Sequence, residues 1–170
     1  MPRLHVCSLA RLSETVRTTG ARSLVTLLNI ETLVARPAEI DPQRHLYIRI
    51  GDITEPLDGH VLPAEEHVEQ VIAFARAWDR NEPLVIHCHA GVSRSTAAAF
   101  IIACALAPSR AETEIADAIR RASHTATPNR RIVAIADAML KRNGRMMAAI
   151  ERIGRGSDCY EGVPFVLELT

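Results

Sequence analysis

One helix-length stretch, residues 95–107, is apolar on nearly every side and rich in alanine. A helix without a polar face has to be buried, so other elements must surround this one. Directly before it lies a short β-rich run, Leu84–His87, opened by Pro83. The chain therefore has to build its core around one strand–loop–helix unit.

The first half of the chain alternates short apolar runs with a helical stretch. Strands are expected at residues 4–7, 24–28, 45–50 and 84–87. Between the last two, residues 65–78 carry apolar side chains at helical spacing. Strands separated by helices indicate a parallel sheet covered on both faces. We therefore expect an α/β fold, with a central, mostly parallel sheet of about four to five strands and helices on both faces.

Beyond residue 95 the pattern is helical only. Amphipathic helices are expected at residues 112–122 and 130–142, and a short last helix at residues 145–153. The apolar tail at residues 163–169 has no predicted place. With 170 residues and no linker or repeat, residues 1–170 are expected to form one domain.

The composition of the chain excludes several classes of protein and of binding partner. The chain is 48% hydrophobic and 24% charged, which excludes a disordered protein. Its 20 Lys+Arg balance 20 Asp+Glu, so it lacks the positive surplus of nucleic-acid-binding proteins. No apolar run approaches the roughly 18 residues of a spanning helix, and no leader is visible, so no membrane contact is expected. The four cysteines form no CxxC pair, which favours a reducing, cytoplasmic setting.

The residues between the predicted strand and the buried helix are suited to binding an anion. They read His87-Cys88-His89-Ala90-Gly91-Val92-Ser93-Arg94-Ser95. A strand–loop–helix turn aims backbone N–H groups at one spot beside a helix N-terminus, where a phosphate dianion binds. Gly91 permits the tight bend, and the planar fork of Arg94 matches two phosphate oxygens. The predicted phosphate-binding residues are His89, Ala90, Gly91, Val92, Ser93 and Arg94.

Cys88, at the start of this loop, is the candidate nucleophile. The loop dipoles and Arg94 favour its thiolate, which would attack the phosphorus of a bound phosphate in line. The product is a phospho-cysteine intermediate. Ser95 would hydrogen-bond the thiolate as it leaves in the second step, and His87 is expected to hold the loop rather than transfer protons.

The run His-Cys-x5-Arg-Ser, with Gly91 and Ser93 inside it, resembles the signature of the cysteine-dependent protein tyrosine phosphatases, in particular the dual-specificity branch and its small bacterial relatives. The resemblance covers about residues 49–140, including Thr127-Pro128-Asn129. It implies hydrolysis of phosphotyrosine on proteins or peptides, with phosphoserine and phosphothreonine left open. It also implies that phosphate, sulfate or vanadate binds in the loop, and that no metal or cofactor is needed.

A general acid must protonate the leaving oxygen. Relatives carry it just after the third strand, where Asp52 matches by position. Asp58 is the alternative, because Cys88 follows Asp52 by 36 residues and Asp58 by 30, and the usual family spacing lies between the two. Glu55 and His60 on the same loop are weaker candidates.

Other functions stay open at this point. They are a phosphoinositide or other small phosphomonoester phosphatase, a phosphate-binding pseudophosphatase, and a rhodanese-like sulfurtransferase. A metal site at His87-Cys88-His89 is disfavoured, because strand neighbours alternate faces and further ligands are missing. Cys7, Cys104 and Cys159 are interpreted as small buried side chains. Whether Cys7 or Cys104 could form a disulfide with oxidised Cys88 is an open hypothesis, as is the oligomeric state.

Overall fold

The computed structural model describes residues 1–170 and contains one five-stranded sheet in the order β3-β2-β4-β1-β5. Its strands are β1 (Arg3–Cys7), β2 (Ser23–Leu28), β3 (His45–Arg49), β4 (Leu84–His87) and β5 (Phe165–Glu168). β1 to β4 run parallel to one another, and β5 pairs antiparallel with β1. The expected mostly parallel α/β sheet is confirmed.

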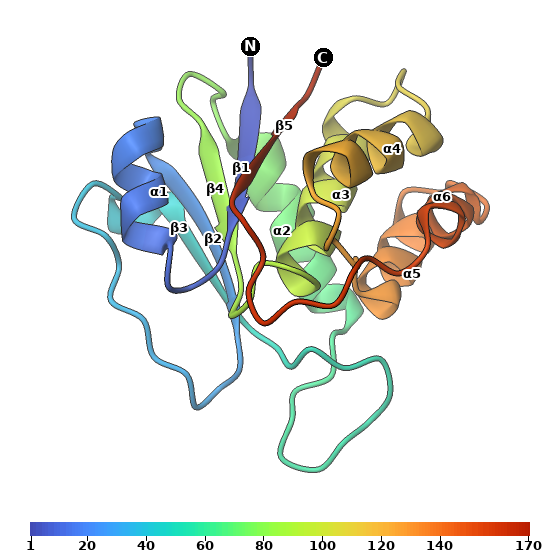
Figure 1. Cartoon of the computed structure of the whole chain (residues 1–170), viewed down its shortest axis with the longest axis horizontal. Helices are drawn as coiled ribbons and strands as arrows, with labels where there is room; N and C mark the ends of the chain where they lie inside the picture. The colour runs from blue at the N-terminus through green and yellow to red at the C-terminus, as the bar shows by residue number, and fades with distance from the viewer.

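Helices cover both faces of the sheet, one on the first face and five on the second (Figure 1). α1 (Leu12–Thr19) packs through Leu12 and Val16 on the first face, against Leu24 of β2 and Val85 of β4. The second face carries α2 (Glu65–Ala77), α3 (Arg94–Leu106), α4 (Glu112–Ala122), α5 (Arg130–Met139) and α6 (Arg145–Ile153). A short 3-10 turn, η1 (Pro42–Arg44), leads into β3.

α3 is the centre of the larger core, as its all-round apolar sequence predicts. Every residue from Arg94 to Cys104 is buried, and the side chains from Ala97 to Cys104 are fully inaccessible. α2, α4 and α5 pack against it, and α6 lies farther out against α4 and α5 (Figure 1). Burial of these apolar groups, at about 25 cal/mol per Å², is the main force that fixes the start of α3 relative to the sheet.

Two elements differ from expectation. The prediction that only helices follow residue 95 is wrong, since the tail returns to the sheet as β5, with Phe165 and Leu167 facing the core and Val166 and Glu168 facing outward. Four residues are too few for a clear alternating pattern, and the pairing depends on β1, far away in the sequence. No helix was predicted at α1, because its eight residues are too few for a clear helical pattern.

The carboxyl ends of the four parallel strands meet at one edge of the sheet, and the loops that follow them gather there (Figure 1). In open α/β sheets this edge forms the ligand-binding crevice. The loop after β4 holds Cys88, and the loop after β3 holds Asp52. No helix of the structure is long and apolar enough to cross a membrane.

Candidate active site

The loop between β4 and α3 turns its carbonyl groups outward. Its four outward carbonyls accept backbone hydrogen bonds from other segments: His89 O from Leu9 N at 3.0 Å, Ala90 O from Gly162 N at 2.8 Å, Val92 O from Thr127 N at 2.9 Å, and Ser93 O from Asn129 N at 3.2 Å. All peptide bonds are trans, so the N–H of each such peptide points the opposite way. The N–H groups of residues 90, 91, 93 and 94 therefore face into the loop, which forms an anion-binding nest beside the N-terminus of α3.

Gly91 is required by this geometry for two reasons. Its φ is +73°, in the left-handed region that side chains disfavour. A Cβ at this position would also lie 2.8 Å from the carbonyl carbon of Cys7 and from the nitrogen of Ser8. The loop thus rests directly on the backbone that follows β1, and only glycine permits that approach.

The Cys88 thiol lies at the bottom of the loop, with its side chain buried. The Gly91 N–H donates to Cys88 Sγ at 3.3 Å, which confirms that this N–H points inward. Ser95 Oγ, in the first turn of α3, lies 3.1 Å from the same sulfur. The Gly91 N–H and the Ser95 hydroxyl therefore both reach the same sulfur.

The protein holds the guanidinium group of Arg94 by one of its nitrogens, Nη1. Nη1 donates to Asn29 Oδ1 at 2.8 Å and to the carbonyl of Ile50 at 3.0 Å, which uses both of its N–H groups. Nε is buried and has no partner in the protein. Nε and Nη2 form the edge that binds two oxygens of a phosphate at once, so this edge is free for an anion.

His87 connects the loop to the interior of the sheet. Its Nδ1 lies 3.0 Å from the carbonyl of Cys88, which can only accept, so Nδ1 carries the proton. Nε2 then accepts from Thr26 Oγ1 at 2.8 Å, and Thr26 in turn accepts from His45 Nε2, also at 2.8 Å. Burial, the largest influence, lowers the pKa of His87 to about 4. The side chain is therefore neutral at neutral pH, and its Nδ1–H donates to the Cys88 carbonyl.

This low pKa predicts a loss of stability in acid. Between the usual pKa of 6.5 and the folded value of about 4, the unfolded chain binds a proton that the folded chain does not. The contribution of His87 to the free energy of unfolding should be complete above pH 6.5 and decrease by up to roughly 3 kcal/mol as the pH falls through 4. NMR titration of the His87 ring is the direct measurement, and a midpoint near 6.5 would contradict the prediction.

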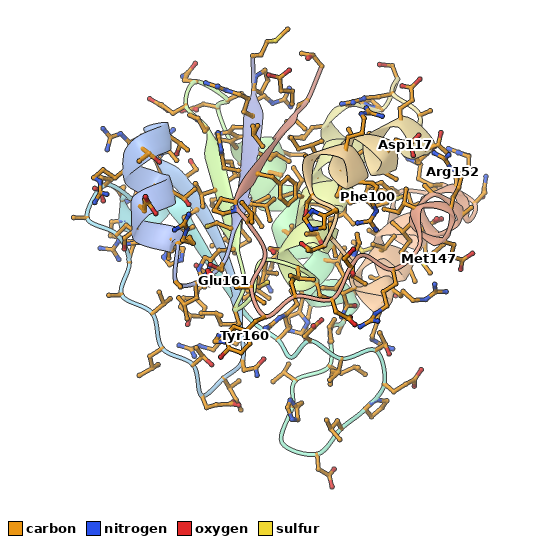
Figure 2. The ribbon with its side chains drawn as sticks, viewed as in Figure 1. Phe100, Asp117, Met147, Arg152, Tyr160 and Glu161 are labelled. Carbon is orange, nitrogen blue, oxygen red and sulfur yellow. The ribbon has the colours of Figure 1, made fainter.

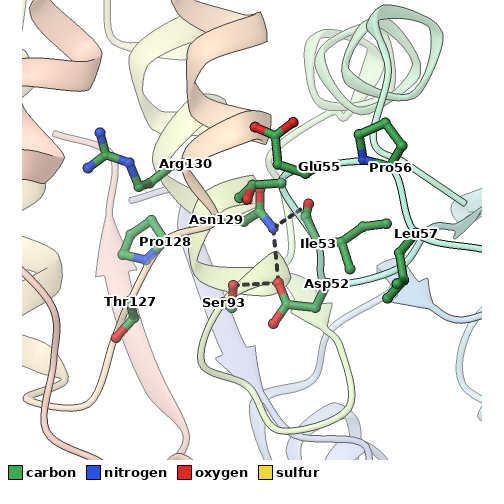
Figure 3. A pocket seen from close by; sticks show the side chains of 11 residues that line it. Asp52, Ile53, Glu55, Pro56, Leu57, Ser93, Thr127, Pro128, Asn129 and Arg130 are labelled. Atoms are coloured by element: carbon green, nitrogen blue, oxygen red, sulfur yellow. Dashed lines mark hydrogen bonds between the residues drawn. The ribbon is translucent and has the colours of Figure 1, made fainter. Parts of the chain in front are cut away.

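Asp52 lies against the loop, whereas Asp58 does not. Asp52 Oδ1 accepts hydrogen bonds from Ser93 Oγ at 2.6 Å and from Asn129 Nδ2 at 3.0 Å (Figure 3). Because Oδ1 is occupied by two donors, a proton on this carboxyl group belongs on Oδ2. Asp58 is an exposed residue of the turn that ends at Gly59.

A cleft of about 540 Å³ opens next to this contact, between the loop after β3 and the start of α5 (Figure 3). Asp52, Glu55, Ser93, Asn129 and Arg130 contribute its polar lining. Glu55 thus lines the cleft from an exposed position, while His60 is exposed outside it. Of the loop between β4 and α3, Ser93 lines this cleft.

Sequence reasoning missed two site residues. Asn29, directly after β2, holds Arg94, and nothing in its local sequence signals this contact. Asn129 is buried and also caps α5, because its Oδ1 accepts from the backbone N–H groups of Arg131 and Ile132. The available signal for Asn129 was the Thr127-Pro128-Asn129 run, which is part of the family resemblance.

The three cysteines outside the loop differ in burial. Cys159 is exposed, so its interpretation as a buried side chain is wrong, whereas Cys7 and Cys104 are buried. Burial raises the pKa of both buried thiols to about 12. Cys104 lies ten residues along α3 from Arg94, about 15 Å at 1.5 Å per residue, and Cys7 packs on the opposite face of the sheet from Cys88. The His89 side chain is exposed, and no group of three side chains in the structure could hold a metal ion.

Comparisons with solved structures agree with the fold. The crystal structure of the Cydia pomonella PTP-2 phosphatase matches with a TM-score of 0.62 at 18% identity, over 79% of this chain and 84% of that one. The crystal structure of human DUSP28 matches with a TM-score of 0.61 at 16% identity, over 82% of this chain and 94% of that one. A mouse putative dual specificity phosphatase, crystallised with zinc tungstate, matches at 0.63 and 17%, over 86% of both chains. No curated protein sequence matches.

One family model covers more than half of the chain. Residues 8–108 match the model described as "Polymorphic toxin system, DSP-PTPase phosphatase". This range includes β2, β3, β4 and α3, with the loop that contains Cys88 and Arg94. The chain therefore belongs to this DSP-PTPase phosphatase family, a dual-specificity-like branch of the cysteine-dependent protein tyrosine phosphatases.

Proposed function

We propose that residues 1–170 work as one phosphatase unit that hydrolyses phosphotyrosine on proteins through a phospho-cysteine intermediate. The observation that carries this proposal is the free Nε–Nη2 edge of Arg94, with its buried, unpartnered Nε, at the end of a loop whose N–H groups face inward. A buried donor without a partner is rare and costly, and a phosphate oxygen would satisfy it. Phosphate, sulfate and vanadate should bind there for the same reason.

The reaction has two steps. In the first, Cys88 Sγ attacks phosphorus, the P–O ester bond breaks, and the proton on Asp52 Oδ2 moves to the leaving oxygen. In the second, Asp52 takes a proton from water, the water oxygen attacks phosphorus, and the S–P bond breaks. Ser95 Oγ, at 3.1 Å, donates to the sulfur as negative charge returns to it. Arg94 and the loop N–H groups stabilise the charge on the phosphoryl oxygens in both steps.

The assignment of Asp52 as general acid predicts a dependence on the leaving group. Asp52→Asn should lose about 10²–10³-fold in kcat on phosphotyrosine peptide, because the phenolate then leaves without a proton. On an aryl phosphate with a strongly acidic phenol the loss should be only a few-fold. Steady-state rates over a series of aryl phosphates measure this slope. Asp58→Asn is the matched control, and a steepened slope in that variant alone would move the assignment to Asp58.

Phosphotyrosine is favoured over phosphoinositides by the loop composition. Ala90, Val92 and Ser93 contribute no positive charge, and His89 is the one basic residue apart from Arg94. A lipid headgroup with several phosphates would need more cations around the loop. Peptides carrying phosphotyrosine, phosphoserine or phosphothreonine, together with a phosphoinositide, should be compared at equal concentration with chelator present. Turnover of phosphotyrosine peptide is expected, and faster turnover of the lipid would overturn this substrate class.

The family description also sets the biological context of the proposal. It names polymorphic toxin systems, so we propose that the phosphatase activity is the toxic one. The Cys88 thiol must be reduced to act, which favours the cytoplasm as the place of action. Production of the wild type should slow the growth of a host cell, whereas Cys88→Ser should not.

A further inference from the structure

The C-terminal segment, residues 156–162, lies against the loop that the proposed function assigns to phosphate, although the family model ends at residue 108. Gly156 N donates to Thr127 Oγ1 at 3.0 Å, and Ser157 N donates to the carbonyl of His124 at 2.9 Å. The segment then reaches the loop itself, before it enters β5. In Figure 2, Tyr160 and Glu161 lie beside the carboxyl end of the sheet.

Two contacts bind this segment to the loop and its support. Gly162 N donates to the carbonyl of Ala90 at 2.8 Å, and this is one of the four bonds that turn the loop carbonyls outward. Ser8 Oγ donates to Glu161 Oε1 at 2.8 Å, and Ser8 is the residue on whose backbone Gly91 rests. The residues that follow β1 and the C-terminal segment are therefore bonded to each other, and both also contact the loop.

Gly162 also comes unusually close to the loop. It is buried, and a Cβ placed on it would lie 3.0 Å from the carbonyl oxygen of Gly91 and 3.3 Å from that of Ala90. Gly91 has little freedom to move away, because it already contacts Cys7 and Ser8. A methyl group at residue 162 would consequently displace the peptides that aim N–H groups at the anion by a few tenths of an ångström.

We propose that Glu161 and Gly162 are positioning residues of this phosphatase, which hold the phosphate-binding loop in its anion-binding shape. The proposal rests on the proposed function, because it assumes that the loop binds the phosphoryl group. Neither residue touches the reacting atoms. Their effect passes through the Ala90 and Gly91 peptides and through Ser8, and it is therefore expected in anion binding more than in stability.

The test measures the affinity for inorganic phosphate by calorimetry and its Ki as an inhibitor of aryl phosphate hydrolysis. Gly162→Ala should weaken phosphate binding about tenfold, and Glu161→Ala about three- to tenfold, the range expected for one ordinary hydrogen bond, because the Ser8–Glu161 contact acts on the loop only indirectly. Glu161→Gln keeps an acceptor for Ser8 and should recover most of the affinity. Val163→Ala, next to Gly162 but exposed, is the matched control and should bind like the wild type.

The outcomes separate the two proposals. If the wild type binds no phosphate and has no turnover, the proposed function fails, and the positioning role fails with it. If the wild type binds phosphate and both Gly162→Ala and Glu161→Ala bind it equally well, the positioning role alone fails. A purely structural role predicts instead that the variants have a lower melting temperature and an unchanged Kd for phosphate. It also predicts that Glu161→Gln and Glu161→Ala lower the melting temperature equally.

Discussion

The Cys88→Ser variant is expected to lose about 10⁴-fold or more of its turnover on phosphotyrosine peptide, while its fold is retained. A serine hydroxyl is a far weaker nucleophile than a cysteine sulfur, so the first step should nearly stop. The loop N–H groups and Arg94 are unchanged, so the variant should still bind phosphopeptide. Rate measurements together with calorimetric binding of the same peptide test both expectations.

A chemical control accompanies this variant. Wild-type enzyme quenched in acid during turnover should carry a phosphoryl group on Cys88, detectable by mass spectrometry, whereas Cys88→Ser should carry none at that position. Ser and Cys are close in volume, so the melting temperature should change little although the Cys88 side chain is buried. More than a tenth of wild-type activity in the variant, or a phosphoryl group on another residue, would contradict the covalent route.

The sequence predicts the strand–loop–helix unit around Cys88 well, because this unit depends on interactions between residues that are close in the sequence. A strand that ends at His87 and a helix that begins at Arg94 follow from short-range patterns, and the residues between them form a compact turn. Gly91 is recognisable because glycine is typical of a tight turn. Arg94 is recognisable because an arginine at the start of an apolar helix is unusual. The position of Asp52 follows from the end of β3, which periodicity also indicates.

The surroundings of the loop could not be predicted in the same way. Asn29 meets Arg94 because β2 and β4 are neighbours in the sheet, and strand order is not written in any one segment. Asn129 reaches Asp52 only once α5 has packed beside α3. Gly162 reaches Ala90 because β5 pairs with β1, a contact between the two ends of the chain. Each of these contacts is set by tertiary packing, which outweighs local pattern.

Arg94→Lys is expected to lower kcat/KM on phosphotyrosine peptide by about 10³-fold, although the positive charge is kept. Two acceptors hold Nη1 and so align the guanidinium group. The parallel N–H bonds of Nε and Nη2 then remain for two phosphoryl oxygens. An ammonium group offers one point of charge and cannot hold Asn29, Ile50 and two oxygens at the same time. Because the phosphoryl oxygens must be held as the P–O bond breaks, the loss should fall on kcat as well as on KM.

Asn29→Ala is the matched control for this variant, since it removes one aligning acceptor and leaves the fork in place. Its loss should be roughly tenfold, well below that of Arg94→Lys. If Arg94 served only to satisfy the Ile50 carbonyl and fill space under the loop, Lys would restore much of that role, and activity would stay within about threefold of wild type. That result would remove the strongest argument for anion binding, because the partnerless Nε would then have no bearing on the reaction. A loss of 10³-fold with an unchanged melting temperature would assign the free edge of this one arginine, among the nineteen in the chain, to the phosphoryl group.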